Sequence, residues 1–389
     1  MILFRSRSLL ALALGHFTID IYSSLLPVMF PFLVDSLHLT YTQVGFLITL
    51  FAFTSSLTQP LFGFLADRLE MRLLGAMALL WTATLTVLAA YSRDYPSLAL
   101  LVALAGLGTA AFHPQAWGKA SAAASEQRTT SGLAIFGSSG AAGYAAGPLI
   151  GGVLFAATGL EGAVVLMIMA LATAPILLFF SPLPRPLPEA RTKTRRQGEG
   201  PLVWFILPLI GLIVLLPWAS RSLSTYLPLL YVNKGYSIIT ASQLLFLLLL
   251  AEALGSLLGG LLADRWGVKR VIVAALALAS PFFYLFLHGP ASSLLPFLLL
   301  LGLCLGATSP ITMGLAQSLL PASRAMVSGL ALGSSFVAGG VGAGITGVIA
   351  DRLGLMRGLD LLIILPLIAS FLCLLLPAQS PFVSQEEVP

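Results

Sequence analysis

A few ionisable side chains interrupt the long apolar segments of this sequence. His16 and Asp20 are four residues apart, so on a helix they would share one face. Glu252 stands alone among Leu and Ala residues, and Arg221 is the one cation deep inside its segment. In apolar surroundings a carboxylic acid favours its neutral form, which allows it to take up and release a proton. We therefore interpret Asp20, with His16 beside it, and Glu252 as candidate proton carriers.

Structural roles compete with these interpretations. Asp20 and His16 could form a buried pair that fixes their helix to a neighbour, and Glu252 could hold its helix through Arg221. The planar guanidinium of Arg221 suits a phosphonate or carboxylate, but a salt bridge to Asp20 or Glu252 would also explain it. The two roles of Arg221 are compatible, because a proton on the acid would free the guanidinium for an anion.

Other polar and aromatic residues could contact a bound molecule. His113 and Gln115 flank Pro114, whose ring leaves a backbone carbonyl unpaired in a helix. They could face a cavity, or they could satisfy the polar groups of the kink. Tyr22 and Tyr226 could line the same cavity, although packing and interface anchoring explain aromatic residues in such segments more often.

These residues belong to a chain with the composition of a membrane protein. Of its 389 residues, 58% are hydrophobic and 9% are charged, whereas a soluble domain has about 25% charged residues. The apolar runs are continuous and not alternating, which excludes a transmembrane β-barrel. We expect an all-α integral membrane protein with twelve spans of about 20 residues or more. The expected spans are 8–34, 41–66, 73–91, 97–120, 130–157, 161–181, 201–231, 239–263, 271–288, 291–318, 325–350 and 358–378.

Several other classes are disfavoured. The net charge of +5 comes from Lys and Arg in short gaps between apolar runs, which argues against a nucleic-acid partner. Cys304 and Cys373 lie inside apolar segments and make no disulfide framework. We find no metal-ligand spacing, phosphate-binding loop or nucleophile elbow. We therefore expect no enzyme activity, no metal and no cofactor.

Charge also predicts orientation and domain organisation. Most Lys and Arg residues fall on one side if the N-terminus is cytoplasmic, as the positive-inside rule requires. We expect both termini in the cytoplasm and the chain in the cytoplasmic (inner) membrane. Residues 182–200 are rich in Pro and basic residues and read as a cytoplasmic linker. The expected domains are a six-helix bundle at 1–181 and another at 201–389, which ends in a short cytoplasmic tail.

The two expected bundles repeat one another. GFLADR at 63–68 recurs as GLLADR at 260–265, and AGLGTAAFHP at 105–114 parallels LGLCLGATSP at 301–310. SGLAIFGSS from Ser131 also parallels SGLALGSS from Ser328. A duplicated unit predicts a site between the halves near mid-membrane, about which they can rock.

The loops after the second and eighth spans resemble the signature loop of the major facilitator superfamily. The resemblance implies the fold of that superfamily, with two pseudo-symmetric six-helix bundles. It also implies that the loop residues tie the cytoplasmic loop to helix ends and hold one gate state. Those residues are Gly63, Asp67, Arg68 and Arg72 in the first loop, and Asp264, Arg265, Lys269 and Arg270 in the second.

The fifth span resembles the antiporter motif of proton-driven exporters in that superfamily. The matching residues are Gly143, Gly147, Pro148, Gly151 and Gly152. Glycines four residues apart let helices approach closely, and a proline can bend the helix. Close packing alone would also explain the glycines.

A closer resemblance is to the fosmidomycin-resistance type of exporter. It rests on GHFTID at 15–20, GLGTAAFHPQ at 106–115 and RSLSTYLPLLY at 221–231. The resemblance implies a monomeric secondary transporter whose partners are protons, membrane lipids and a small-molecule substrate. It implies proton-coupled efflux of an amphiphilic or anionic compound, with the proton gradient as the energy source. Metabolite uptake, facilitated diffusion and lysolipid flipping on the same fold stay open.

Overall fold

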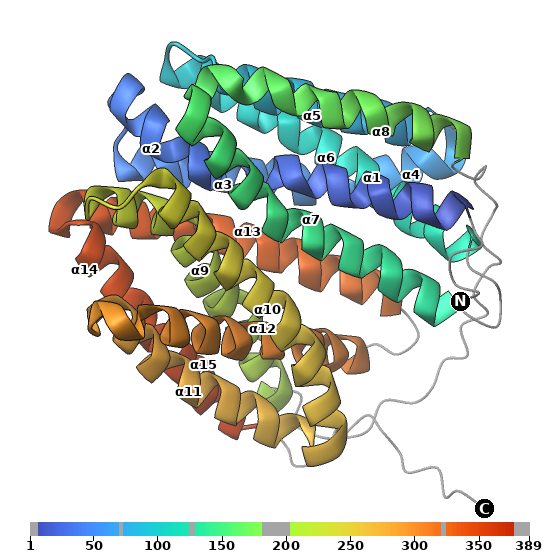
Figure 1. Cartoon of the computed structure of the whole chain (residues 1–389). Coiled ribbons are helices and arrows are strands. Elements are labelled where there is room, and N and C mark those ends of the chain that lie inside the picture. Colours follow the sequence, from blue (N-terminus) through green and yellow to red (C-terminus); the bar gives the residue numbers. More distant parts are fainter. Residues whose placement is uncertain (1–6, 70–72, 124–128, 181–202, 320–323, 377–389) are drawn as a thin grey trace, which may run out of the picture.

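The computed structural model describes residues 7–69, 73–123, 129–180, 203–319 and 324–376. Regular structure within these residues is helical, without a strand (Figure 1). The prediction of an all-α chain is therefore confirmed. The predicted linker at 182–200, the tail beyond 376 and Arg72 lie outside the described residues, as do the side chains of Asp67 and Arg68.

The first half of the chain supplies the first six of the predicted spans. Its elements are α1 (Arg7–Ser23), α2 (Leu26–Leu37), α3 (Tyr41–Ser56), α4 (Gln59–Leu69), α5 (Leu74–Ala89), α6 (Tyr95–Ala123), α7 (Thr129–Thr158), the 3-10 helix η3 (Leu160–Leu166) and α8 (Met167–Phe180).

The second half supplies the other six spans. Its elements are α9 (Val203–Asn233), α10 (Ile238–Trp266), α11 (Val268–His288), the 3-10 helix η4 (Ala291–Ser293), α12 (Leu294–Leu319), α13 (Arg324–Leu353), α14 (Leu355–Asp360), the 3-10 helix η6 (Leu361–Ile363) and α15 (Ile364–Leu374).

Proline explains why two of the predicted spans are broken helices. The span predicted at 8–34 divides into α1 and α2, and the span at 41–66 divides into α3 and α4. Pro27 has no N–H for the carbonyl of Ser23, which is the last residue of α1. Pro60 stands in the same relation to Ser56, the last residue of α3. Each hydrogen-bond ladder therefore ends four residues before its proline.

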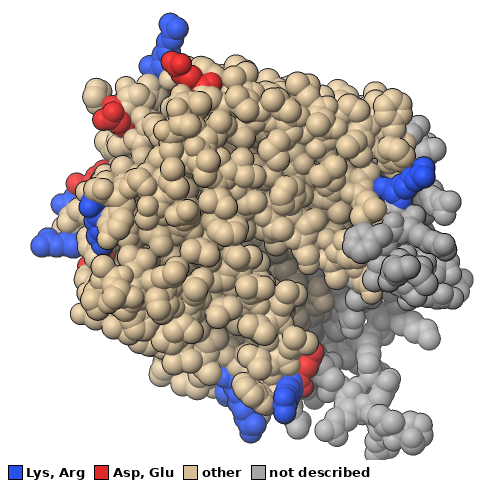
Figure 2. Space-filling model, viewed as in Figure 1, with Lys and Arg blue, Asp and Glu red and all other residues tan. Residues whose placement is uncertain are grey.

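The surface of the molecule is apolar over a broad band. When consecutive helices such as α1 and α2 are taken as one span, eleven helical spans of the described residues are long and apolar enough to cross a membrane. The shorter apolar helix Leu74–Ala89 occupies the third predicted span. Large apolar side chains such as Phe179 and Phe371 are 70% and 67% exposed. Figure 2 places Lys, Arg, Asp and Glu toward two ends of the molecule, with an uncharged band between them. Lipid makes such a surface favourable, and the chain is a multi-pass membrane protein.

The two halves lie against each other along a few helix pairs. Figure 1 shows α1 to α8 in the upper part of the view and α9 to α15 in the lower part. Across the boundary α3 packs on α13, α7 on α10, and α2 on α9. This arrangement leaves the inner faces of α7, α9 and α13 near the boundary, where a site between the halves was predicted.

Among the described residues, the two halves pack tightly against each other at one end. We call the end where α1 begins the terminal end, and the other the opposite end. A Cβ atom built onto a glycine shows how close the neighbouring helix comes. Toward the opposite end, a Cβ on Gly340, Gly344 or Gly347 of α13 would lie within 3.1 Å of an atom of α3. Toward the terminal end, the same test at Gly329 and Gly333 meets nothing within 4 Å. The space between the halves therefore widens toward the terminal end.

Candidate functional site

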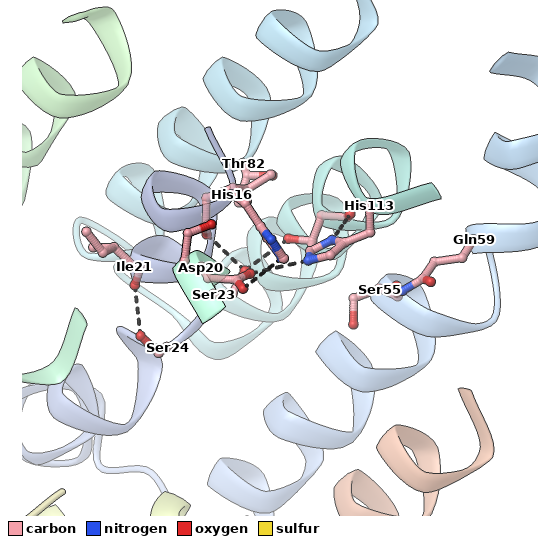
Figure 3. A network of polar contacts seen from close by, with 12 residues as sticks. His16, Asp20, Ile21, Ser23, Ser24, Ser55, Gln59, Thr82 and His113 are labelled. Carbon is pink, nitrogen blue, oxygen red and sulfur yellow. Dashed lines mark hydrogen bonds and ion pairs between the residues drawn. The ribbon is translucent and has the colours of Figure 1, made fainter. Parts of the chain in front are cut away.

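Two histidines and an aspartate meet inside the first half (Figure 3). His16 and Asp20 lie on α1, as their spacing predicted, and His113 comes from α6. The Nε2 atom of His16 lies 3.3 Å from Asp20 Oδ2, and Nε2 of His113 lies 3.4 Å from Asp20 Oδ1. The side chains of His16, Asp20 and His113 are 6%, 13% and 19% exposed, so the cluster is nearly enclosed.

Backbone contacts fix the tautomer of both imidazoles. Nδ1 of His16 is 2.8 Å from the carbonyl oxygen of Phe136, and Nδ1 of His113 is 2.8 Å from that of Thr109. A carbonyl oxygen only accepts, so each Nδ1 must carry the hydrogen. A neutral ring then turns an unprotonated Nε2 toward Asp20. Three acceptors converge without a donor, and at least one added proton or cation is needed between them.

The walls of the cluster keep these groups in place. The Phe136 ring stacks on His16 with centroids 4.2 Å apart, and His113 meets His16 edge-on at 5.1 Å. A Cβ at Gly140 of α7 would lie 2.4 Å from His16 Nε2 and 2.7 Å from Asp20 Oδ2. Gly140 therefore brings the α7 backbone against the carboxylate. Sequence reasoning missed Phe136 and Gly140, because only the fold sets α7 beside α1.

The cluster also offers one ligand atom from each of three side chains within 4.8 Å of one another. His2Asp is a donor set that a divalent cation can use. The sequence predicted no metal because it shows no recognised ligand spacing, and spacing cannot report ligands that two separate helices bring together.

Arg221 of α9 reaches across the boundary between the halves. Its guanidinium donates a hydrogen bond to the hydroxyl of Tyr144 on α7. Its Cζ atom lies 5.5 Å from the ring centroids of both Tyr144 and Phe336. Ion pairs recorded among the described residues do not include Arg221. One of its nitrogens therefore donates to an aromatic hydroxyl, and the guanidinium forms no ion pair with Asp20 or Glu252.

Glu252 of α10 accepts a hydrogen bond from Ser220, the residue before Arg221. The hydroxyl of Ser220 donates to Glu252 Oε1 at 2.7 Å. This hydrogen bond joins α10 to α9 within the second half. It is the helix-to-helix role that the sequence left open for Glu252, made through Ser220 and not through Arg221.

The two tyrosines predicted to line a cavity are buried. Tyr22 is 1% exposed and donates to the carbonyl of Leu166, and Tyr226 is fully buried. The Tyr226 hydroxyl lies 2.9 Å from two carbonyl oxygens, those of Tyr41 and Ala343. In this conformation both hydroxyls hold helices together and neither is available to a bound molecule.

The side chain of Gln115 lies away from the cluster, although His113 is only two residues before it in the sequence. It is 8% exposed, and a Cβ at Gly75 of α5 would lie 2.8 Å from its Nε2. The side chain of Gln115 therefore packs between α6 and α5, whereas His113 turns to the cluster.

The second signature loop makes one clear tie to a helix end. Nζ of Lys269 donates to the carbonyl oxygens of Leu374 and Leu376 at 2.7 and 2.6 Å. Asp264, Arg265 and Arg270 are exposed. In the first loop Gly63 is described, and its Cβ position lies 3.5 Å from Pro114 of α6.

The glycines of the antiporter-like segment set the position of α7. A Cβ at Gly143 would lie 2.0 Å from the carbonyl oxygen of Phe17, and one at Gly147 would lie 2.1 Å from Ser24 Oγ. Gly151 faces α2 in the same way. Gly152 turns to the other half, where a Cβ would lie 2.0 Å from Ser242 Oγ of α10. Pro148 lies inside α7 without ending it.

Comparison with known proteins gives full-length relatives. The chain is 29% identical over 372 residues to the fosmidomycin resistance protein of Escherichia coli (strain K12), covering 92% of this chain and 90% of that one. It is 28% identical over 399 residues to an uncharacterized transporter of the major facilitator type from Bacillus subtilis (strain 168), with 95% and 92% covered.

Solved structures share the fold at low identity. A bacterial homolog of the human lysosomal transporter Spinster, in an inward-facing and occupied conformation, superposes with a TM-score of 0.82 at 18% identity, covering 96% of both chains. The nucleoside transporter NupG gives 0.75 at 14% identity, with 95% of this chain and 99% of that one covered. The model of the Major Facilitator Superfamily matches residues 12–249 and 209–387. With this fold, this repeat and these matches, the chain belongs to the Major Facilitator Superfamily.

Proposed function

We propose that this transporter exports a small amphiphilic or anionic compound across the cytoplasmic membrane while protons flow inward. The terminal end faces the cytoplasm, in keeping with the excess of Lys and Arg there. The observation that carries the proposal is the cluster of His16, Asp20 and His113, whose facing acceptors require a proton or another cation.

A single helix connects this cluster with the boundary between the halves. The Phe136 carbonyl and Gly140 of α7 touch the cluster, and Tyr144 of the same helix holds Arg221. Gly140 and Tyr144 are one helical turn apart, about 6 Å along the axis. A change in the protonation of Asp20 that moves α7 would therefore change the grip of Tyr144 on Arg221. This link supports coupling between protons and a bound compound.

Arg221 supports the chemical class of the compound. Its guanidinium is flanked by the Tyr144 and Phe336 rings and faces no carboxylate at ion-pair distance among the described residues. A cation held by one neutral hydroxyl can exchange that partner for an anion, which binds a guanidinium more strongly. The rings add apolar area for the rest of an amphiphilic molecule.

Growth inhibition in a host that lacks its major exporters tests the proposal. The panel would contain phosphonates such as fosmidomycin, lipophilic cations and neutral inhibitors. Expression of the protein should protect against one anionic or amphiphilic class. The protection should fall at least about tenfold in Asp20→Asn and Arg221→Ala, the effect of about 1.4 kcal/mol at each site.

Matched controls separate these roles from loss of surface charge. Asp35→Asn removes an exposed carboxylate at the far end of α2, and Arg357→Ala removes an exposed arginine of α14. Both should protect as the unchanged protein does. Confirmed membrane expression without protection from any compound would overturn the export proposal, and retention of a lysolipid on purification would redirect it to lipid handling.

A further inference from the structure

The start of α3 is bound by the end of α13, which belongs to the other half. Asp351 Oδ1 accepts a hydrogen bond from the backbone N–H of Tyr41 at 2.8 Å. Its Oδ2 accepts one from the N–H of Thr42, also at 2.8 Å. One carboxylate thus bridges residues more than 300 positions apart at the opposite end of the molecule.

These two N–H groups have no other partner within their helix. The first N–H groups of any α-helix lack an intrahelical acceptor. In α3, Thr40 and Gln43 form a capping box and satisfy each other. That leaves Tyr41 and Thr42, which Asp351 takes. An anion at this place also meets the positive end of the helix dipole.

Further contacts hold the same seam. The Asn233 amide donates to the Tyr41 hydroxyl at 3.0 Å, and the Thr49 hydroxyl donates to the Gly340 carbonyl at 2.7 Å. A Cβ at Gly45 would lie 2.5 Å from the carbonyl oxygen of Ala343. The α3 and α13 backbones therefore touch here, and Asp351 is the charged residue among these contacts.

We propose that Asp351 is a gate residue whose carboxylate keeps the opposite end closed and sets the balance between the two access states. To release a compound at that end, α3 and α13 must part, and both Asp351 hydrogen bonds must break. The proposal goes beyond the transported compound and its energy source, because it concerns the gate alone.

Distances between paired spin labels test it on the whole protein without any compound. Cys304 and Cys373 are first replaced by Ala. One label pair, Asp35→Cys with Arg357→Cys, spans the halves at the opposite end, on α2 and α14. A second, Leu73→Cys with Val268→Cys, spans them at the terminal end. All four positions are exposed.

With Asp351 in place, the pair at the opposite end should give mainly the short distance. In Asp351→Ala the long-distance fraction at that end should rise so that the open-to-closed ratio increases at least about tenfold, as expected for losing hydrogen bonds to a charged group. The pair at the terminal end should shift to shorter distances. Asp351→Asn keeps the size of the side chain, but its NH2 group would face one of the two backbone N–H groups and could not accept from it. The distances in this variant should therefore shift in the same direction as in Asp351→Ala.

Asp360→Ala is the matched control. This substitution also removes a contact at the opposite end, the 2.6 Å pair between Asp360 and His288. Both residues of that pair belong to the second half, so the contact does not join the halves. The substitution should leave both distance distributions unchanged. Unchanged distances in both Asp351 variants, or equal opening in Asp360→Ala, would overturn the role of Asp351 as the gate residue.

Discussion

At the scale of single residues, the acceptors around Asp20 determine what the cluster can hold. Two Nε2 atoms and a carboxylate repel one another until a hydrogen or a cation lies between them. One proton satisfies one of the two contacts, and two protons satisfy both. The cluster therefore changes its contacts, and not only its charge, when it gains or loses a proton.

Asp20→Asn should separate the two modes of transport. The amide donates permanently to one histidine but cannot exchange a proton, so gradient-driven accumulation of a compound that gives protection in cells should fall at least about tenfold in liposomes. Exchange of the labelled for the unlabelled compound needs no net proton movement and should persist. A chelator in all assays excludes a bound metal as the cause. Equal gradient-driven accumulation by Asp20→Asn and the unchanged protein would contradict the role of Asp20.

Arg221→Lys tests recognition separately from charge. Lysine keeps the positive charge but loses the planar fork and stacks less well between Tyr144 and Phe336. The KM for a transported anion should rise about tenfold while the maximal rate changes less. For a neutral compound of the same panel the KM should stay the same. An equal loss for both compounds would indicate a structural role for Arg221.

The sequence predicted part of this chemistry. The spacing of four residues correctly put His16 and Asp20 on one helix face. It could not add His113, which the chain delivers from α6, nor place Tyr144 against Arg221. Helical periodicity reports neighbours within one helix, whereas partners across a bundle depend on how helices pack.

At the scale of elements, α7 contacts the histidine–aspartate cluster, Arg221 and the other half of the molecule. One face packs on α1 through Gly143 and Gly147, and Gly152 meets α10 of the other half. Side chains at these positions would push the helices apart. The glycines therefore fix the distance at which Phe136 and Tyr144 reach their partners.

Gly143→Ala should destabilise the protein by about 1–3 kcal/mol, because its Cβ would overlap the carbonyl of Phe17. Thermal unfolding in detergent measures the effect. Gly118→Ala in α6 is the matched control, since its Cβ would meet nothing within 4 Å. That change should be neutral or stabilise by up to about 1 kcal/mol. Equal melting temperatures for the two variants would refute tight packing at Gly143.

The elements themselves were largely predictable, and their breaks were not. Continuous apolar runs located the spans, but hydropathy continues through Ser24 and Leu57, where α1 and α3 end. Only the missing N–H of Pro27 and Pro60 marks those breaks. The triplet Ala-Asp-Arg at 66–68 and 263–265 was recognised in the loops, whereas its third copy at 350–352 was missed because it lies at the opposite end.

At the scale of the whole molecule, the repeat and the motifs correctly predicted the fold of the Major Facilitator Superfamily, and the domain boundary at residues 182–200 stays a prediction. The state of the boundary was not predictable, because one sequence serves every access state. The structure captures one state, closed where Asp351 meets α3 and open toward the terminal end. Exchange between this state and its counterpart is what a secondary transporter requires.

Proton movement driven by a transported compound tests the central claim most directly. The purified protein in liposomes with an enclosed pH dye would receive fosmidomycin, and then each compound that gives protection in cells. The account predicts proton movement opposite to the movement of the compound, lost in Asp20→Asn and kept in Asp35→Asn. Transport of a protected compound down its own gradient with no proton movement would contradict it.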